Sequence, residues 1–166
     1  MNQQPIDEYT QGDYEISTDK HKLDLDVIHS YLTRSYWSPG IPKDQVAKAI
    51  EHSLCFGLHY IPTNTAHSQV GFARAVTDYT TFAYLADVFV LPSFQGRGLG
   101  KWMMECVVNS PTIDGIRTFL LLTRDAHGLY AQSGFIQLPN PDLIMGKHNE
   151  VSWYNPELVA WPPNEN

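Results

Sequence analysis

Asp87-Val-Phe-Val-Leu-Pro-Ser-Phe-Gln-Gly-Arg-Gly-Leu-Gly-Lys101 is the stretch that decides the fold. It lies at the end of an apolar segment, residues 81–91, whose aromatic and β-branched residues predict a central strand. Pro92 ends that strand, and alternating glycines lead into a helix. Glycines let the backbone approach an anion closely, and the first N–H groups of a helix lack internal partners. The stretch therefore predicts a diphosphate-binding loop, to which Arg97 and Lys101 add positive charge.

The spacing of these glycines excludes two common phosphate-binding motifs. A P-loop requires a serine or threonine after its lysine, and here Trp102 follows Lys101. A dinucleotide-binding fingerprint requires its third glycine one residue later than Gly100. What remains is Gln-x-x-Gly-x-Gly, beginning at Gln95, directly after an apolar strand.

The rest of the chain predicts a mixed α/β domain. Hydrophobic periodicity indicates two helices before the decisive stretch, the first capped by Asp24 or Asp26 and the second beginning near Pro42. Strands are expected at residues 14–17, 54–61, 69–77 and 118–123, a short helix at 128–133, and a last hairpin from 135–138 and 143–147. This order implies antiparallel strands followed by a strand–helix–strand crossover.

Two motifs together resemble the GNAT superfamily of N-acetyltransferases. The stretch from Asp87 to Lys101 looks like that family's acetyl-CoA-binding strand, loop and helix, and Leu129-Tyr-Ala-Gln-Ser-Gly-Phe135 resembles its second signature. The resemblance covers roughly residues 13–147. It implies a mixed, mostly antiparallel central sheet flanked by helices, in which two central strands splay apart and admit CoA.

The resemblance also implies how acetyl-CoA, the expected co-substrate, would be held. Backbone groups of the strand end would bond the pantetheine arm, and one N–H would polarise the thioester carbonyl. The glycine-rich loop would hold the diphosphate. The implied cofactor-binding residues are Phe89, Val90, Leu91, Gln95, Gly96, Arg97, Gly98, Leu99, Gly100 and Lys101.

Tyr130 matches the family's general acid, which protonates the departing thiolate, and a phenol suits this because its pKa lies just above that of a thiol. A packing role against the cofactor is the alternative. The general base stays open, because Tyr84 and Leu122 stand where many relatives carry a glutamate. Asp87, His127 or a water chain could serve instead, although strand alternation predicts that Asp87 faces away from Tyr84.

The acceptor side is expected near residues 35–42, where Tyr36 and Trp37 would wall a pocket for an aromatic or cationic amine, or would simply pack on the core. Tyr84 is a further substrate-lining candidate, as are His59 and Arg74. Many relatives have a cofactor-contacting asparagine near residues 123–127, and this sequence lacks it. Either Arg124 or His127 would take its place, or the segment would simply be a tight surface turn.

The predicted activity is direct transfer of acetyl from acetyl-CoA to a primary amine of a small molecule. The alternatives are a peptide or protein N-terminal acetyltransferase and a non-catalytic acyl-CoA-binding domain. An excess of 18 acidic over 11 basic residues argues against a nucleic-acid partner.

Composition also bears on location, metal binding and organisation. No signal peptide or membrane-length apolar run is visible, so a cytoplasmic protein without a membrane partner is expected. Cys55 and Cys106 are expected to be buried thiols, and the spacing of the histidines and cysteines predicts no metal site. Residues 1–12 are expected to be a flexible N-terminal segment, 13–147 the N-acetyltransferase domain and 148–166 a C-terminal extension. The extension would pack back on the domain or onto a second subunit in a homodimer.

Overall fold

A six-stranded sheet organises the chain, in the strand order β1-β2-β3-β4-β5-β6. The computed structural model describes residues 5–147 and 151–153. The first five strands pair antiparallel in succession, and β6 lies parallel to β5. The mixed, mostly antiparallel α/β fold predicted from the sequence is confirmed. The strands are β1 (Glu8–Gln11), β2 (Tyr14–Ser17), β3 (Leu54–Tyr60), β4 (Ser68–Thr77), β5 (Phe82–Val90) and β6 (Thr118–Leu121).

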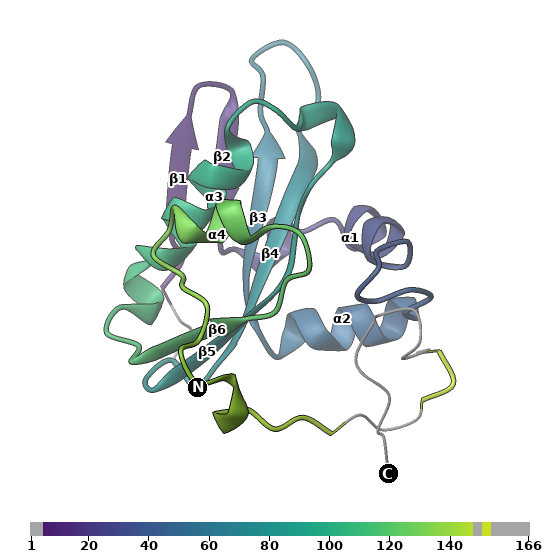
Figure 1. The fold of residues 1–166 in the computed structure, drawn as a ribbon. Coiled ribbons are helices and arrows are strands. Elements are labelled where there is room, and N and C mark those ends of the chain that lie inside the picture. The colour runs from purple at the N-terminus through teal and green to yellow at the C-terminus, as the bar shows by residue number, and fades with distance from the viewer. Residues whose placement is uncertain (1–4, 148–150, 154–166) are drawn as a thin grey trace.

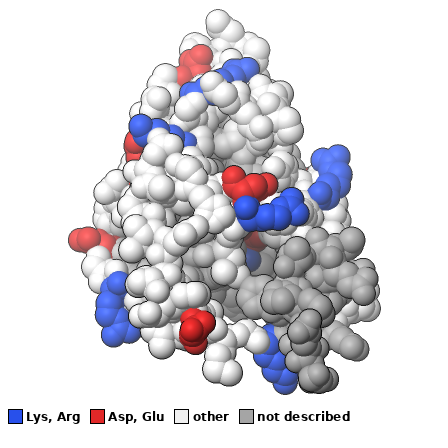
Figure 2. Space-filling view, viewed as in Figure 1, with Lys and Arg blue, Asp and Glu red and all other residues white. Residues whose placement is uncertain are grey.

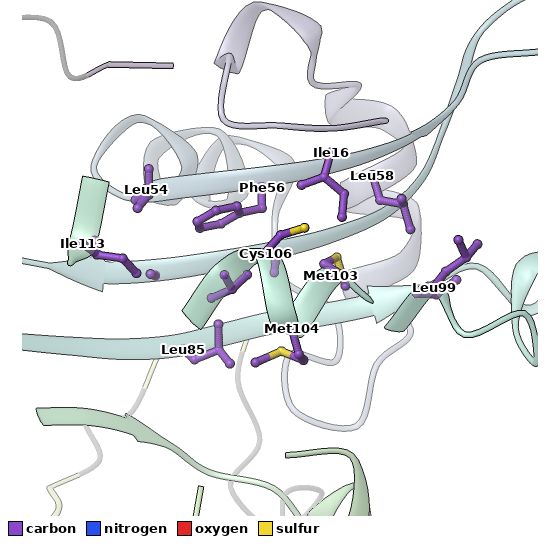
Figure 3. Packing of buried hydrophobic residues seen from close by; sticks show 14 of the residues in the cluster. Ile16, Leu54, Phe56, Leu58, Leu85, Leu99, Met103, Met104, Cys106 and Ile113 are labelled. Atoms are coloured by element: carbon purple, nitrogen blue, oxygen red, sulfur yellow. The ribbon is translucent and has the colours of Figure 1, made fainter. Parts of the chain in front are cut away.

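Helices cover both faces of this sheet (Figure 1). On one face, buried side chains of α1 and α2 form a cluster with Cys55, Phe72 and Phe89. On the other face, α3 packs its apolar stripe against the strands, where Met103 and Cys106 meet Phe56 and Leu58 (Figure 3). The helices are α1 (Leu25–Leu32), α2 (Lys43–Glu51), α3 (Leu99–Val108) and α4 (His127–Ala131), with short 3-10 turns η1 (Lys20–Lys22), η2 (Pro92–Phe94), η3 (Pro111–Ile113) and η4 (Pro141–Leu143).

Local sequence accounts for where the first two helices begin. The Asp24 side chain accepts hydrogen bonds from the N–H groups of Asp26 and Val27, so Asp24 is the cap of α1. Pro42 precedes α2, and its fixed φ suits the start of a helix. Between the two helices, Gly40 has φ +74°. The connecting loop therefore turns sharply and places Tyr36 and Trp37 over the end of the sheet.

The prediction of a flexible N-terminal segment is wrong for residues 7–11. β1 pairs with β2 from Glu8 opposite Ser17 to Gln11 opposite Tyr14. Asp7 is buried, donates its N–H to Thr18 Oγ1 (2.8 Å), and accepts a hydrogen bond from the Ser110 hydroxyl. The sequence did not predict this strand because its side chains are mostly polar. An edge strand is held by backbone hydrogen bonds, so it does not require alternating apolar residues.

The predicted last hairpin is also wrong. In the described part of the chain, residues 135–147 contain the turn η4 but no strand. Pro139 and Pro141 lack the N–H groups that a strand ladder needs, and Ile136 and Met145 are exposed instead of buried. Of the C-terminal extension, residues 151–153 are described, and a Cβ added at Gly40 would lie 3.5 Å from the Trp153 carbonyl oxygen. The remaining residues of the extension lie outside the described part, and so does any contact with a second subunit.

No helix in the described ranges has the length and apolar character needed to cross a bilayer. On the face seen in Figure 2, Lys and Arg side chains are scattered among Asp and Glu and form no continuous basic surface.

Candidate active site

The sheet opens between β5 and β6. The two strands pair from Phe82 opposite Thr118 to Leu85 opposite Leu121, and no pair is formed beyond Leu85. A cavity of about 1750 Å³ lies along this opening, lined by the second half of β5, the glycine-rich loop, the loop after α1 and the segment from β6 to α4. The splayed strand pair expected from the sequence is therefore present, with a cavity beside it.

A β-bulge lies on β5 where the strand reaches the cavity. Phe72 pairs with Phe89 and Arg74 with Ala86, so two residues of β5 face one of β4. Asp87, inside the bulge, has φ +56°, in the left-handed region that Asp tolerates better than most residues. The bulge interrupts the alternation of side chains and brings the Asp87 carboxylate to the same face as Arg74. The expectation that Asp87 faces away from Tyr84 is therefore wrong.

The Asp87 carboxylate is held by two donors. Arg74 Nε donates to its Oδ2 at 2.8 Å, and Trp37 Nε1 donates to its Oδ1 at 3.2 Å. Arg74 Nη1 also donates to Ser53 Oγ at 3.0 Å. This buried network ties the loop after α1 to the bulge and to the start of β3. It uses both oxygens of the carboxylate that was a candidate base.

The glycine-rich loop has the conformation that its sequence predicts. Gly96 and Gly98 have φ +75° and +78°, and an added Cβ would meet no atom within 4 Å at either position. The glycines are thus required by the backbone conformation, not by crowding. Gly98 precedes α3, which has no capping side chain, so the first N–H groups of this helix have no partner within the helix.

Six of the seven loop residues line the cavity, and Arg97 does not. Its guanidinium donates to Tyr14 Oη (3.1 Å) and to the Ser93 carbonyl (3.0 Å). The Lys101 side chain is half exposed at the cavity wall. Arg97 therefore contributes its backbone to the loop, whereas Lys101 can reach into the cavity.

At the end of β5, the three predicted pantetheine-binding residues are not equivalent. The Leu91 N–H donates to the Val70 carbonyl (2.8 Å), and the Leu91 carbonyl accepts from the Phe94 N–H (2.8 Å). Backbone groups alternate in direction along a strand, so Phe89 and Leu91 face β4 and the Val90 N–H faces the opening. The predictions for Phe89 and Leu91 are corrected, because the backbone of Phe89 faces β4 and both backbone groups of Leu91 are already bonded.

Tyr130 lies on α4 and lines the cavity. Gly134, with φ +86°, ends the turn after this helix, and the Phe135 N–H donates to the Tyr130 carbonyl (3.2 Å). Burial raises the pKa of Tyr130 to about 12, with smaller contributions from Tyr36 and the Asp125 carboxylate. The phenol is therefore protonated at neutral pH and can act as a proton donor.

The three predicted substrate-lining residues, Tyr36, Trp37 and Tyr84, all line the cavity. The rings of Tyr36 and Trp37 meet edge to face at 5.0 Å. Tyr31, which the sequence did not single out, stacks on Phe89 with ring centroids 3.9 Å apart. An aromatic wall therefore continues from the loop after α1 to β5.

Two histidines considered from the sequence lie away from this wall. His127 is exposed and does not line the cavity. His59 is buried in β3, and its Nε2 lies 3.0 Å from the Lys22 carbonyl oxygen, outside the cavity. Asp125, which the sequence placed in a surface turn, does line the cavity, and no sequence motif marked it.

Both cysteines are buried, as expected. Burial raises the pKa of Cys55 to about 12 and that of Cys106 to about 11, so neither is a thiolate at neutral pH. Within the described residues, no group of three or more His, Cys, Asp or Glu side chains is placed to hold a metal ion.

Known proteins share this fold and these motifs. The family model for the acetyltransferase (GNAT) domain matches residues 58–137. A protein of Gibberella zeae described as an acetyltransferase is 33% identical over an alignment of 143 positions, and the match covers 75% of this chain and 80% of the relative. A rice protein named chloroplastic serotonin N-acetyltransferase 2 is 32% identical over 125 residues, 75% of this chain and 61% of the relative. A crystal structure from Xanthomonas campestris, described as a GNAT-family acetyltransferase, superposes with a TM-score of 0.76 at 43% identity and covers 89% of this chain and 97% of that one.

The family match and these relatives identify an acetyltransferase. The chain belongs to the GNAT family of acetyltransferases.

Proposed function

We propose that this protein transfers an acetyl group from acetyl-CoA directly to the primary amine of a small molecule. The observation that carries the proposal is a single cavity lined at one end by the glycine-rich loop and at the other by Tyr130 and aromatic side chains. A cofactor and an acceptor can therefore meet in it without a covalent enzyme intermediate. The rice relative named for serotonin acetylation supports a small amine as acceptor.

The loop supplies the groups that an acetyl-CoA diphosphate needs. The unpartnered N–H groups at the start of α3, including those of Leu99 and Gly100, carry the positive end of the helix dipole. Lys101 adds a mobile positive charge, and Arg97 contributes its backbone. The Val90 N–H faces the open edge of β5 and can polarise the thioester carbonyl, a contribution of about 3–4 kcal/mol in other acyl transfers.

Tyr130 serves as the general acid. The amine nitrogen attacks the thioester carbonyl carbon, the C–S bond breaks, and the departing thiolate takes the phenolic proton. The raised pKa of Tyr130 keeps the phenol protonated at neutral pH, and it also places this pKa further above that of a thiol than the usual value for tyrosine does, so the proton transfer is less balanced than was expected from the sequence. In the described part of the chain, no hydrogen bond to another residue restrains the hydroxyl. It is therefore free to turn toward the sulfur.

Removal of the ammonium proton is best explained by water in the cavity. Asp87 already accepts hydrogen bonds from Arg74 and Trp37, and His127 does not line the cavity. Neither of these candidate bases is therefore free at the reacting end. Tyr84 and Leu122 stand where many relatives carry a glutamate, and neither is a carboxylate. A non-catalytic acyl-CoA-binding role is therefore the second candidate. A peptide N-terminus as acceptor, a cytoplasmic location and a homodimer remain proposals.

Thermal unfolding with acetyl-CoA, ATP and NAD at matched concentrations tests the cofactor. A ligand at about 100 times its Kd adds about 2.7 kcal/mol, which in a domain of this size raises Tm by roughly 5–10 °C. The expected result is a shift with acetyl-CoA alone. A larger shift with ATP or NAD would show that the loop binds another ligand.

Tyr130→Phe tests catalysis. The expected result is at least about a tenfold fall in turnover with an unchanged acetyl-CoA shift, since only the transferred proton is removed. Tyr79→Phe, in the turn between β4 and β5, is the matched control, because it removes a phenolic hydroxyl outside the cavity. Unchanged turnover in Tyr130→Phe would remove the acid role. Absence of turnover in the wild type on every amine, with the acetyl-CoA shift intact, would favour the non-catalytic candidate.

A further inference from the structure

The acceptor end of the cavity is closed by a contact between two loops far apart in the sequence. Tyr36, after α1, accepts a hydrogen bond from the Arg124 N–H (3.3 Å) and directs its hydroxyl to Asp125 Oδ1 (3.5 Å). The Arg124 guanidinium lies over the Tyr36 ring, 3.9 Å from its centroid. A distance of 3.5 Å is long for a bond between a hydroxyl and a carboxylate. The Asp125 carboxylate is therefore only weakly satisfied by its neighbour.

Three arginines around the cavity have other partners. Arg74 is paired with Asp87, and the Arg124 guanidinium is stacked on Tyr36. Arg34, two residues after the end of α1, donates to the carbonyl and hydroxyl of Ser30 in that helix. The remaining lining cations are Lys101, 4.0 Å from Glu105 at the loop, and Lys147. Asp87 and Asp125 are the carboxylates of the described cavity wall, and in that part of the chain Asp125 has no ion-pair partner.

Asp125 lines the same cavity as Tyr130. Its charge contributes to the raised pKa of Tyr31, on α1, and of Tyr130, on α4. In the described part of the chain, the Tyr36 hydroxyl is the group that contacts this exposed carboxylate. The aromatic rings of Tyr31, Tyr36 and Trp37 line the same cavity and can pack against an alkyl or aryl body.

We propose that Asp125 binds the positive charge of the acceptor and so makes this enzyme selective for cationic primary amines. An ammonium placed on this carboxylate lies in the same cavity as Tyr130 and the aromatic wall. The inference rests on the proposed acetyltransferase function and assigns Asp125 as its specificity-determining residue. The open side of the cavity lets the ammonium proton leave to solvent before the nitrogen attacks.

Two acceptors that differ in charge test this. The first is the cationic amine, such as 2-phenylethylamine, that the wild type turns over best; the second is an O-alkylhydroxylamine of the same size, which is uncharged at neutral pH. Asp125→Asn is expected to raise KM for the cationic amine at least about tenfold, equivalent to about 1.4 kcal/mol. KM for the neutral acceptor is expected to change by less than about twofold, because no charge interaction is lost. KM for acetyl-CoA and its thermal shift stay as in the wild type.

Two variants serve as controls. Asp114→Asn removes an exposed carboxylate between η3 and β6, outside the cavity, and is expected to leave both KM values unchanged. Tyr36→Phe removes the hydroxyl contact to Asp125 but keeps the ring. If Asp125 acted only by holding this loop, Tyr36→Phe would reproduce the effect of Asp125→Asn, and the proposal would be overturned. An equal rise of KM for both acceptors, or no rise, would also overturn it.

A wild type that acetylates only the neutral acceptor would refute the selectivity while leaving the proposed acetyl transfer intact. Loss of the acetyl-CoA shift in the wild type would instead refute the proposed function itself.

Discussion

Replacing Asp87 by Asn is expected to destabilise the fold strongly, because it removes one charge from a buried ion pair. The Asp87 and Arg74 side chains are only 9% and 16% exposed, and Trp37 donates to the same carboxylate. Asn keeps the size of the side chain and tolerates the φ of +56° at this position. The change therefore isolates the loss of the negative charge opposite Arg74.

The magnitude follows from the burial. Removing one partner of a buried ion pair costs about 3–5 kcal/mol, and the lower end applies because Asn still offers an acceptor oxygen. For a chain of this length, about 3 kcal/mol corresponds to a fall in Tm of roughly 6–12 °C. Urea unfolding followed by tryptophan fluorescence and by circular dichroism measures the free energy of unfolding directly.

Two further variants make the test specific. In Arg74→Met/Asp87→Asn both charges are absent, so this double variant is expected to be less destabilised than the sum of the single variants, by at least about 1 kcal/mol. Asp26→Asn breaks an exposed pair with Lys43 and is expected to leave Tm almost unchanged. Equal effects of Asp87→Asn and Asp26→Asn, or a double variant at least as unstable as the sum, would refute the reasoning.

Two more predictions concern the proposed acetyl-CoA-binding loop and the proposed general acid, Tyr130. Gly98→Ala places a Cβ on a residue with φ +78°, which costs about 1–2 kcal/mol of strain. This variant is expected to bind acetyl-CoA about tenfold more weakly, as measured by calorimetry. Gly100→Ala is the control, because Gly100 lies in ordinary helical conformation and its backbone stays unstrained. If both variants bind equally, the left-handed conformation of Gly98 is not what the cofactor requires. Because burial raises the pKa of Tyr130 to about 12, its phenol stays protonated up to about pH 10, so kcat is expected to show no falling limb up to that pH. A falling limb near pH 9 that disappears in Tyr130→Phe would contradict this.

Features that depend on short stretches of sequence were predicted well. The glycine-rich loop was recognisable because Gly96 and Gly98 need left-handed φ values that few other residues adopt. Asp24 as the cap of α1 and Gly134 after α4 are local in the same sense. The apolar run at β5 also identified an internal strand.

Predictions failed where a contact joins distant segments or breaks a regular pattern. β1 was missed because its pairing with β2 depends on backbone hydrogen bonds, not on apolar residues. Asp87 was assigned to the wrong face because the bulge depends on the pairing of two strands. The last hairpin was predicted from apolar residues that remain exposed, such as Ile136 and Met145.

The sequence by itself determined the order of the main strands and helices from β2 to α4, the conformation of the glycine-rich loop and the short helix that carries Tyr130, because these depend on backbone preferences and on residues near one another in the chain. Only the tertiary structure decided which side chains meet at the acceptor end. Tyr36 and Asp125 are 89 positions apart, and Arg74 and Asp87 lie on different strands. Their approach depends on packing of α1 and the sheet, and on a bulge whose extra residue has no signature of its own. A contact of this kind is fixed by the whole fold, so no local pattern can reveal it.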